Sequence, residues 1–326
     1  MLAATKPVAA VLTLLSVPLV AGLWSASEFN RQSALTEPTH VNPPAPQLPA
    51  GQAFAKVTSR AQLYARLGLI AEPQQRRLLV GAQQLFKPTS LPQNCVAVQL
   101  PETVELASVL ELFADFSEHP QAKLGWCFQG HFGELVQASV RGHINFVSTQ
   151  RAYAKANSIQ LPSDASVDLL AHELAHIAGL ADEYAMREPL AQNFCQGRYN
   201  HPSLNVVVTN GRYMSASELQ ALWQQLPWQE QVTHWQQLAQ PTAQGWKLGS
   251  SSEQKFGLFP ADTCKQVGLF AWKPVAETTA MQHFDVPKWP QLYLDLMQNY
   301  LSETLQSSGN LGNHDHGAGN SEKPNQ

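Results

Sequence analysis

The spacing of hydrophobic residues predicts alternating strands and helices in the first half of the chain. Residues 96–100 read VAVQL, the alternation of a half-buried strand, and residues 103–118 carry apolar positions at helical spacing. Two further strands are predicted at 123–128 and 143–148. Ahead of them, residues 52–87 read as two short amphipathic helices separated by Pro73, either a cap on the main domain or a small prosegment.

A longer helix is predicted after Pro162. Ser163 is its expected N-cap, and Asp164 lies in the first turn, where a negative charge suits the helix dipole. Gly179 is expected to end the helix, because glycine adopts the left-handed backbone of a helix terminus without steric cost.

The second half of the chain is predicted to be richer in loops. A short strand is expected at 206–209, a helix at 215–226 and a closing helix at 290–305. From residue 307 the chain is polar and is predicted to be disordered; His314 and His316 there are expected to be solvated, with loose metal binding as the alternative. The fold class predicted from these elements is α+β.

The N-terminus has the pattern of an export signal. A single positive charge, Lys6, precedes an uncharged apolar stretch within residues 1–26, which is either a cleaved signal peptide or a retained membrane anchor. Residues 27–51 are rich in proline and predict an extended linker. They are followed by the helical segment 52–87, the main domain 88–306 and the tail 307–326. We therefore expect a periplasmic or secreted protein, anchored to the membrane if the signal is retained.

Composition and charge narrow the class of protein. The chain has 326 residues, of which 44% are hydrophobic and 14% charged, as in soluble globular domains. Its net charge is -4, and no basic run is present that could neutralise a row of phosphates. Nucleic acid is therefore excluded as an expected partner.

Four cysteines in an exported chain predict two disulfides. We expect Cys95 to pair with Cys127 and Cys195 with Cys264, since each pair then lies on one side of the helix predicted after Pro162. The other two connectivities stay open, as do free buried cysteines.

The strongest chemical signal is the segment HELAHIAGLAD, residues 172–182. His172 and His176 are four residues apart, so on a helix both rings can reach one ion, and Glu173 points near the same place. Zinc held by three protein groups keeps a position for water, and a neighbouring glutamate can take that water's proton. The segment predicts a hydrolytic Zn²⁺ site with Glu173 as the catalytic base.

The third ligand is predicted from the register of the motif. In HExxHxxGxxH sites the helix breaks at the glycine and returns the last residue to the metal. Asp182 occupies that last position, and a carboxylate is an acceptable zinc ligand. Glu183 is the alternative, followed by Glu218; if Asp182 binds the metal, Glu183 is expected to orient a histidine.

The run HELAHIAGLADEY, residues 172–184, resembles the signature of the bacterial IgA-peptidase-type metallopeptidases. It has one residue fewer between the second histidine and the glycine, and this shorter register matches the metzincins, with aspartate as third ligand as in the snapalysin type. The resemblance implies a metzincin-like zinc peptidase domain with a small twisted sheet, a backing helix, an active-site helix and a loop-rich C-terminal subdomain. It also implies a methionine turn beneath the metal, and Met281 is favoured over Met214 because it follows an aromatic-x-Pro sequence.

The expected reaction is hydrolysis of peptide bonds in a protein or peptide substrate. The substrate is expected to pair with an exposed strand edge, with 143–148 as the candidate strand. Tyr184, Tyr213 and His283 are candidate donors to the developing oxyanion. Two other functions stay open: a non-catalytic envelope protein stabilised by a metal, and a zinc amidase acting on cell-wall peptides.

Overall fold

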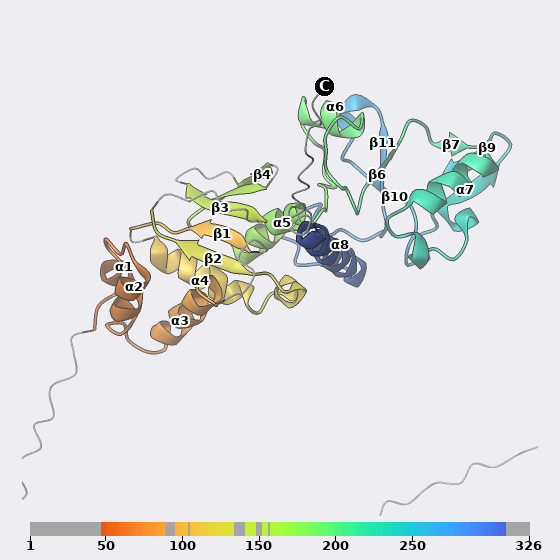
Figure 1. Ribbon diagram of the computed structural model, residues 1–326. Helices are drawn as coiled ribbons and strands as arrows, with labels where there is room; N and C mark the ends of the chain where they lie inside the picture. Colours follow the sequence, from red (N-terminus) through yellow and green to blue (C-terminus); the bar gives the residue numbers. More distant parts are fainter. Residues whose placement is uncertain are drawn as a thin grey trace, which may run out of the picture. The chain divides into compact units, whose positions relative to one another are not determined.

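The computed structural model describes residues 47–88, 95–103, 105–133, 141–147, 152–155 and 157–310 (Figure 1). The predicted export signal, most of the predicted linker and residues 311–326 of the predicted tail lie outside these ranges. Among the described residues, no helix has both the length and the apolar character needed to cross a membrane.

A five-stranded sheet is built from the first half of the chain. Its strands, in spatial order, are β2 (Phe128–His131), β1 (Val96–Gln99), β3 (Gly142–Val147), β5 (Ser158–Pro162) and β4 (Tyr153–Lys155). The first four strands are parallel, and β4 pairs antiparallel with β5 at one edge. The sheet core is apolar, as where Ile144 of β3 lies opposite Ile159 of β5, both fully buried. The predicted strands at 96–100 and 143–148 are thus confirmed over their described residues.

The strand at 143–148 does not offer the exposed edge that we predicted for it. It forms β3, which has β1 on one side and β5 on the other, so its backbone hydrogen bonds are used within the sheet. Within the described part of the chain, the strands with one neighbour in this sheet are β2 and β4.

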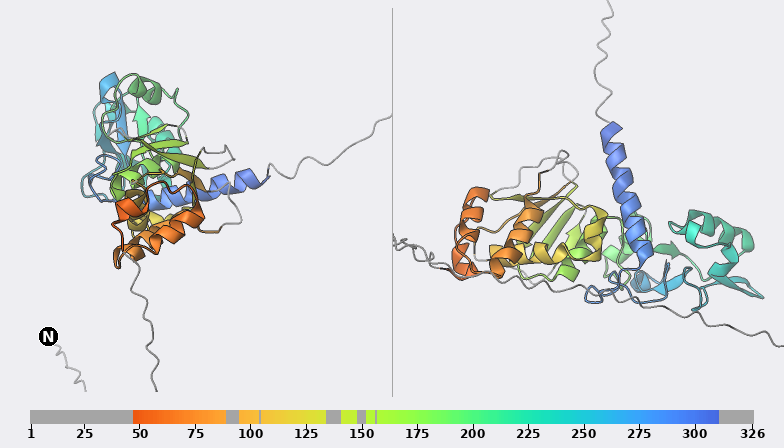
Figure 2. Two further views of the ribbon diagram at one scale, coloured as in Figure 1. Left: turned by 90° about the vertical axis from the view of Figure 1, so that its left-hand side faces the viewer. Right: turned by 90° about the horizontal axis from the view of Figure 1, so that it is seen from below.

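Helices from the N-terminal half pack on this sheet and on one another (Figures 1 and 2). They are α1 (Ala50–Ala53), α2 (Arg60–Leu67), α3 (Gln74–Leu85), α4 (Leu106–Phe116) and α5 (Val167–Ile177). Their buried side chains share one hydrophobic cluster with the strands. The contact between α3 and α4 is close: a Cβ added at Gly81 would lie 1.8 Å from the carbonyl oxygen of Leu110. The segment 52–87 therefore contributes to the core itself.

Two predicted boundaries in this half are wrong. The strand predicted at 123–128 starts only at Phe128, as β2. Residues 120–124 instead form a 3₁₀ helix, η2 (Pro120–Leu124), because Pro120 suits a first helical position and Gly125 ends the turn at φ 74°. Helix α5 begins at Val167 and not directly after Pro162, because a turn follows strand β5: the N–H of Ala165 donates to the carbonyl of Pro162 at 3.1 Å. Ser166, not Ser163, is the N-cap, and its hydroxyl accepts a hydrogen bond from the backbone N–H of Leu169 at 3.2 Å.

The C-terminal half contains two small antiparallel sheets that the sequence pattern predicted only in part. One has the order β10 (Phe259–Ala261), β11 (Phe270–Lys273), β6 (Val207–Thr209), and the other β7 (Tyr213–Met214), β9 (Gly245–Leu248), β8 (Ala239–Thr242). Short 3₁₀ helices lie within the connections of each sheet: η3 (Gln229–Gln231) and η4 (Trp235–Leu238) precede β8, and η5 (Lys265–Val267) lies between β10 and β11. The predicted strand at 206–209 is confirmed as β6.

Three α-helices complete this half: α6 (Leu190–Cys195), α7 (Ala216–Gln225) and α8 (Gln291–Asn310). The helix predicted at 215–226 is confirmed as α7, and its N-terminus is a capping box in which Ser215 and Glu218 bond each other's backbone. Helix α8 begins where the pattern predicts and runs past residue 305 to Asn310.

Both predicted disulfides are confirmed, with S–S distances of 2.01 Å for Cys95–Cys127 and 2.03 Å for Cys195–Cys264. The first joins the beginnings of the adjacent strands β1 and β2, and the second joins the end of α6 to the residue before η5. Two disulfides and no free cysteine among the described residues indicate a location outside the cytoplasm.

Helix α5 lies between two hydrophobic clusters. Leu170, Leu174 and Ile177 belong to the cluster of the five-stranded sheet. Ala175 and Ala178 belong to a second cluster formed mainly by α7, α8 and the segments between them. The helix is therefore held on both sides, which fixes the direction of its remaining polar side chains.

The close packing of α3 on α4 predicts the effect of a single added methyl group. Gly81→Ala should lower the free energy of unfolding by about 1–3 kcal/mol, because the new Cβ cannot fit beside Leu110 without moving a helix. The measurement is urea denaturation of the purified protein. Gly68→Ala is the matched control, since its nearest contact is 3.4 Å and its φ is -64°. Equal stability of the two variants would contradict the close contact.

Candidate metal centre

The polar side chains of α5 gather on one side of the helix. His172 and His176 have ring centroids 5.0 Å apart, as expected for residues one helical turn apart. His172 and Glu173 are each 5% exposed, so the site lies below the surface. Two imidazoles and a carboxylate buried at this spacing need hydrogen-bond partners or an ion that compensates for their lost contact with water.

Gly179 turns the chain back toward these histidines. Its φ is +92°, and a Cβ there would lie 2.9 Å from a methyl carbon of Leu204, so both conformation and space favour glycine. The backbone N–H of Leu180 donates to the carbonyl of Ala175 at 2.9 Å, which closes the helix end. The prediction that Gly179 ends the helix is confirmed, and the following residues bring Asp182 to the site.

His172, His176 and Asp182 place one ligand atom each within 4.8 Å of one another. Both Nε2 atoms lie 3.2 Å from Asp182 Oδ1. Ligand atoms about 2.1 Å from a tetrahedral ion lie about 3.4 Å apart, so this spacing suits one small cation. Asp182 Oδ1 is buried and has no hydrogen-bond partner. The group can therefore hold one small metal ion.

Each histidine is held by its other ring nitrogen. His172 Nδ1 lies 2.8 Å from the carbonyl oxygen of Ala280, and His176 Nδ1 lies 2.9 Å from that of Leu180. A carbonyl can only accept, so Nδ1 carries the proton and the neutral ring has a free lone pair on Nε2. This is the tautomer that binds a metal through Nε2.

The charges in the site depend strongly on one another. Although burial favours the neutral ring, the Asp182 carboxylate raises the pKa of His176 to about 9. Burial opposes ionisation of Asp182 too, but His176 and His172 lower the pKa of that carboxyl. Burial raises the pKa of Glu173, against the opposite effect of the two histidines. Without a cation, a proton on His176 compensates the charge of Asp182; a divalent cation can take its place.

Glu183, the alternative third ligand, points away from this cluster and is fully buried. Its Oε1 accepts hydrogen bonds from Asn205, at 2.9 Å, and from the hydroxyl of Tyr293. Its Oε2 accepts from Thr279 at 2.6 Å and from Lys273 at 3.1 Å. With four donors on its two oxygens, Glu183 is part of the framework of the site and does not join the metal group. Nor does it contact a histidine ring.

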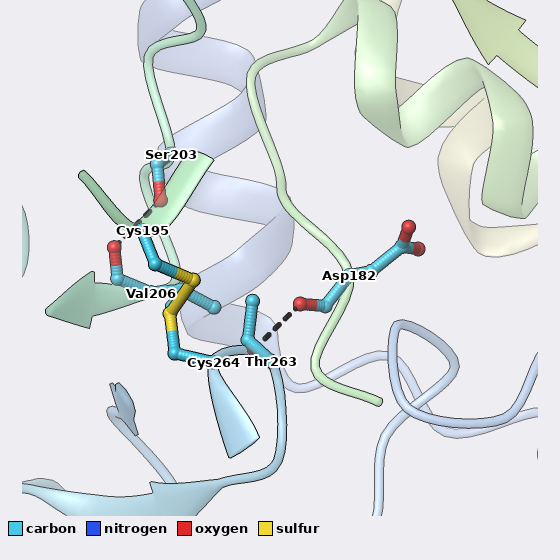
Figure 3. The surroundings of a disulfide bond; sticks show 6 residues. All are labelled: Asp182, Cys195, Ser203, Val206, Thr263 and Cys264. Carbon is cyan, nitrogen blue, oxygen red and sulfur yellow. Dashed lines mark hydrogen bonds between the residues drawn. A yellow bond between two sulfur atoms is a disulfide. The ribbon is translucent and has the colours of Figure 1, made fainter. Parts of the chain in front are cut away.

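The backbone around Asp182 is fixed on both sides. The amide of Asn205 clamps Ala181 by accepting from its N–H at 2.7 Å and donating to its carbonyl at 2.9 Å. The hydroxyl of Thr263 donates to the carbonyl of Asp182 at 2.8 Å. Figure 3 shows that Thr263 directly precedes the half-cystine Cys264, while the Asp182 carboxylate points away from the disulfide. The disulfide thus anchors the segment that supports the third candidate ligand.

Met281 lies in a turn next to the site, whereas Met214 lies in β7 of a separate small sheet. Met281 is fully buried, its carbonyl accepts from the N–H of Glu183 at 3.0 Å, and it follows the residue that bonds His172. Of these two methionines, Met281 therefore has the position implied by the resemblance.

The other side chains considered from the sequence are spread over the molecule. Tyr184 stacks on the ring of His172 at a centroid distance of 6.4 Å, so it lies beside the candidate site. Tyr213 belongs to β7, and Glu218 is used in the capping box of α7. His283 is exposed in the segment after Met281.

Comparisons with known proteins give no further assignment. No protein-family model matches the chain, and neither a curated protein nor a solved structure matches it. The assignment of the site therefore depends on its geometry alone: His172, His176 and Asp182 form a buried group that can hold a metal ion.

One part of the site was missed by the sequence reasoning. A pocket adjoins the candidate ligands, and its lining comes from Ala154 of β4 and from the segment 181–201, which includes α6. Residue 154 lies on a strand of three residues, too short to show alternation. Met186, Leu190 and Phe194 recur every four residues, but Pro189 interrupts this spacing as a helical signal, so no motif marked them. No motif marked the buried donors Asn205, Thr279 and Tyr293 either.

The Glu183 network predicts a large loss of stability when its charge is removed. Glu183→Gln should lower the free energy of unfolding by about 3–5 kcal/mol, because Lys273, whose side chain is 4% exposed, then lacks its buried counter-charge. Denaturant unfolding in the presence of a chelator separates this effect from metal binding. Glu72→Gln removes the carboxylate of an exposed pair with Arg76 and should leave the free energy of unfolding nearly unchanged, because water screens this pair. Similar losses in both variants would refute the structural role of Glu183.

Proposed function

We propose that this protein is a zinc metalloendopeptidase with a metzincin-like fold that hydrolyses peptide bonds of extracytoplasmic proteins or peptides. His172, His176 and Asp182 bind the zinc, and Glu173 is the general base. The observation that carries the proposal is Glu173 itself: its carboxylate interacts electrostatically with all three candidate ligands, and its buried Oε2 has no hydrogen-bond partner among the described residues.

The position of Glu173 suits a proton carrier. Burial raises its pKa, which makes the carboxylate a better base and the carboxylic acid a usable donor. Glu173 accepts a proton from the attacking water and then delivers it to the leaving amine. A bound zinc ion would polarise the scissile carbonyl and lower the pKa of the attacking water.

Three protein ligands support a catalytic site in preference to a structural one. Structural zinc sites use four protein ligands, whereas catalytic sites keep one position for water or substrate. Among the described residues, the metal group contains three members. A metal that only stabilised the fold would have no use for the base Glu173.

A peptide substrate can be placed on the edge strand β4. This strand pairs with β5 on one side, and a backbone hydrogen bond from Ala154 reaches the Glu173 carboxylate. An extended peptide added along β4 would run beside the catalytic glutamate. This replaces the interior strand at 143–148 as the substrate edge.

The proposed enzyme acts outside the cytoplasm, in the periplasm or after secretion. The two disulfides support this, because they persist in oxidising compartments. The export-signal pattern of residues 1–26 supports it too, as either a cleaved signal or a membrane anchor.

The proposal predicts that Glu173→Gln separates metal binding from catalysis. The variant should keep one zinc per chain but lose activity by about 10²–10⁴-fold, since the amide cannot carry the proton. Zinc content is measured by elemental analysis and activity with a peptide library supplemented by cell-wall fragments. Glu253→Gln, at an exposed loop position, is the control and should retain activity.

Two outcomes would contradict the proposal. Undiminished cleavage by Glu173→Gln would remove the glutamate from the reaction. If the zinc-loaded wild type cleaved no peptide, the non-catalytic metal protein would be the better account; cleavage of the cell-wall fragments alone would indicate an amidase.

A further inference from the structure

Of the nine described residues that line the pocket next to the candidate ligands, six are apolar or aromatic. The pocket opens beside His176 and Asp182 and has a volume of about 440 Å³, including space open to solvent. Large apolar or aromatic side chains form much of its wall: Met186, Leu190, Phe194 and Tyr199. Ala154 and Ala181 are small and leave room at the end nearest the metal group.

Charged groups are rare in this lining. Among the described residues that line the pocket, Asp182, which faces the histidines, is the one carboxylate, and none is a lysine or an arginine. The polar ring of His201 is already engaged: its Nε2 lies 3.2 Å from the carbonyl of His176, and its Nδ1 accepts from the N–H of Ser203 at 3.2 Å. A charged side chain in this pocket would find no partner for its charge.

The pocket wall is firmly attached to the rest of the site. Helix α6 provides Leu190 and Phe194 and ends at Cys195, which is bonded to Cys264. The N–H of Met186 donates to the carbonyl of Thr263 at 3.2 Å. Thr263 also supports Asp182, so the wall and the third candidate ligand share one anchor. A pocket held in this way is preformed and can discriminate between side chains.

We propose that this pocket is a specificity subsite that receives an apolar side chain of the substrate next to the scissile bond. The inference rests on the proposed function, because it assumes that the substrate carbonyl lies at the metal. Leu190 is the specificity-determining residue best suited to a test, since it lines the pocket and is 41% exposed at its rim. A bound leucine-sized side chain would cover it.

The test uses binding and does not require catalysis. Zinc-loaded Glu173→Gln protein is titrated calorimetrically with acetyl-amino-acid hydroxamates of glycine, leucine, lysine and glutamate, in which the hydroxamate binds the metal. The leucine compound should bind about tenfold more tightly than the glycine compound, because it buries apolar surface. The lysine and glutamate compounds should gain nothing over glycine.

Leu190→Glu, combined with Glu173→Gln, should remove most of the preference for leucine and favour lysine, because it places a carboxylate at the rim. Val80→Glu is the matched control: Val80 is an exposed apolar residue of α3, and its replacement should leave the series unchanged. Circular dichroism checks that both variants fold.

Equal affinity for all four hydroxamates would overturn the proposal of an apolar subsite. So would an order of affinities that is the same with and without Leu190→Glu. Either result is distinguishable from failure of the proposed function. If no peptide is cleaved but the leucine preference is present and depends on Leu190, the pocket stands and the peptidase assignment falls.

Discussion

The carboxylate of Glu183 is the buried charge on which the arrangement of the candidate site depends. Its four donors come from distant parts of the chain: Asn205, Lys273, Thr279 and Tyr293. A carboxylate without exposure is tolerated only when its charge and its lone pairs are satisfied, so these segments must meet where they do. Glu183 therefore determines where the residue before it, Asp182, can lie.

The same network reaches the histidines through the backbone. Thr279 bonds Glu183, and the next residue, Ala280, offers its carbonyl to His172. On the other side, Asn205 bonds both Glu183 and Ala181. Side chains that never touch the metal group thus hold two of its three members in position. Such supporting contacts decide whether a site has the geometry that its chemistry requires.

The candidate metal group was predictable because it depends on local geometry. On a helix, the four-residue spacing of His172 and His176 places both rings on the same face, and Gly179 marks where that helix ends. These features need no knowledge of distant contacts. The cysteine pairing was one of three connectivities that the sequence allowed, and the structure confirms it.

Other features depend on contacts that the pattern did not reveal. The start of α5 was placed too early because Ser163 is as good an N-cap by type as Ser166; the turn from Pro162 to Ala165 decides between them. Strand 143–148 was predicted to be an edge because it precedes the active-site helix. In the structure β5, and beyond it the three residues of β4, cover that side of the strand. The partners of Glu183 are separated from it by 22 to 110 residues.

The central claim is that His172, His176 and Asp182 bind one zinc ion beside Glu173. The most direct measurement is anomalous diffraction at the zinc edge from crystals of the zinc-loaded protein. The account predicts one anomalous peak in contact with Nε2 of both histidines and with the Asp182 carboxylate. A zinc ion bound by Glu183, or one bound away from α5, would contradict it.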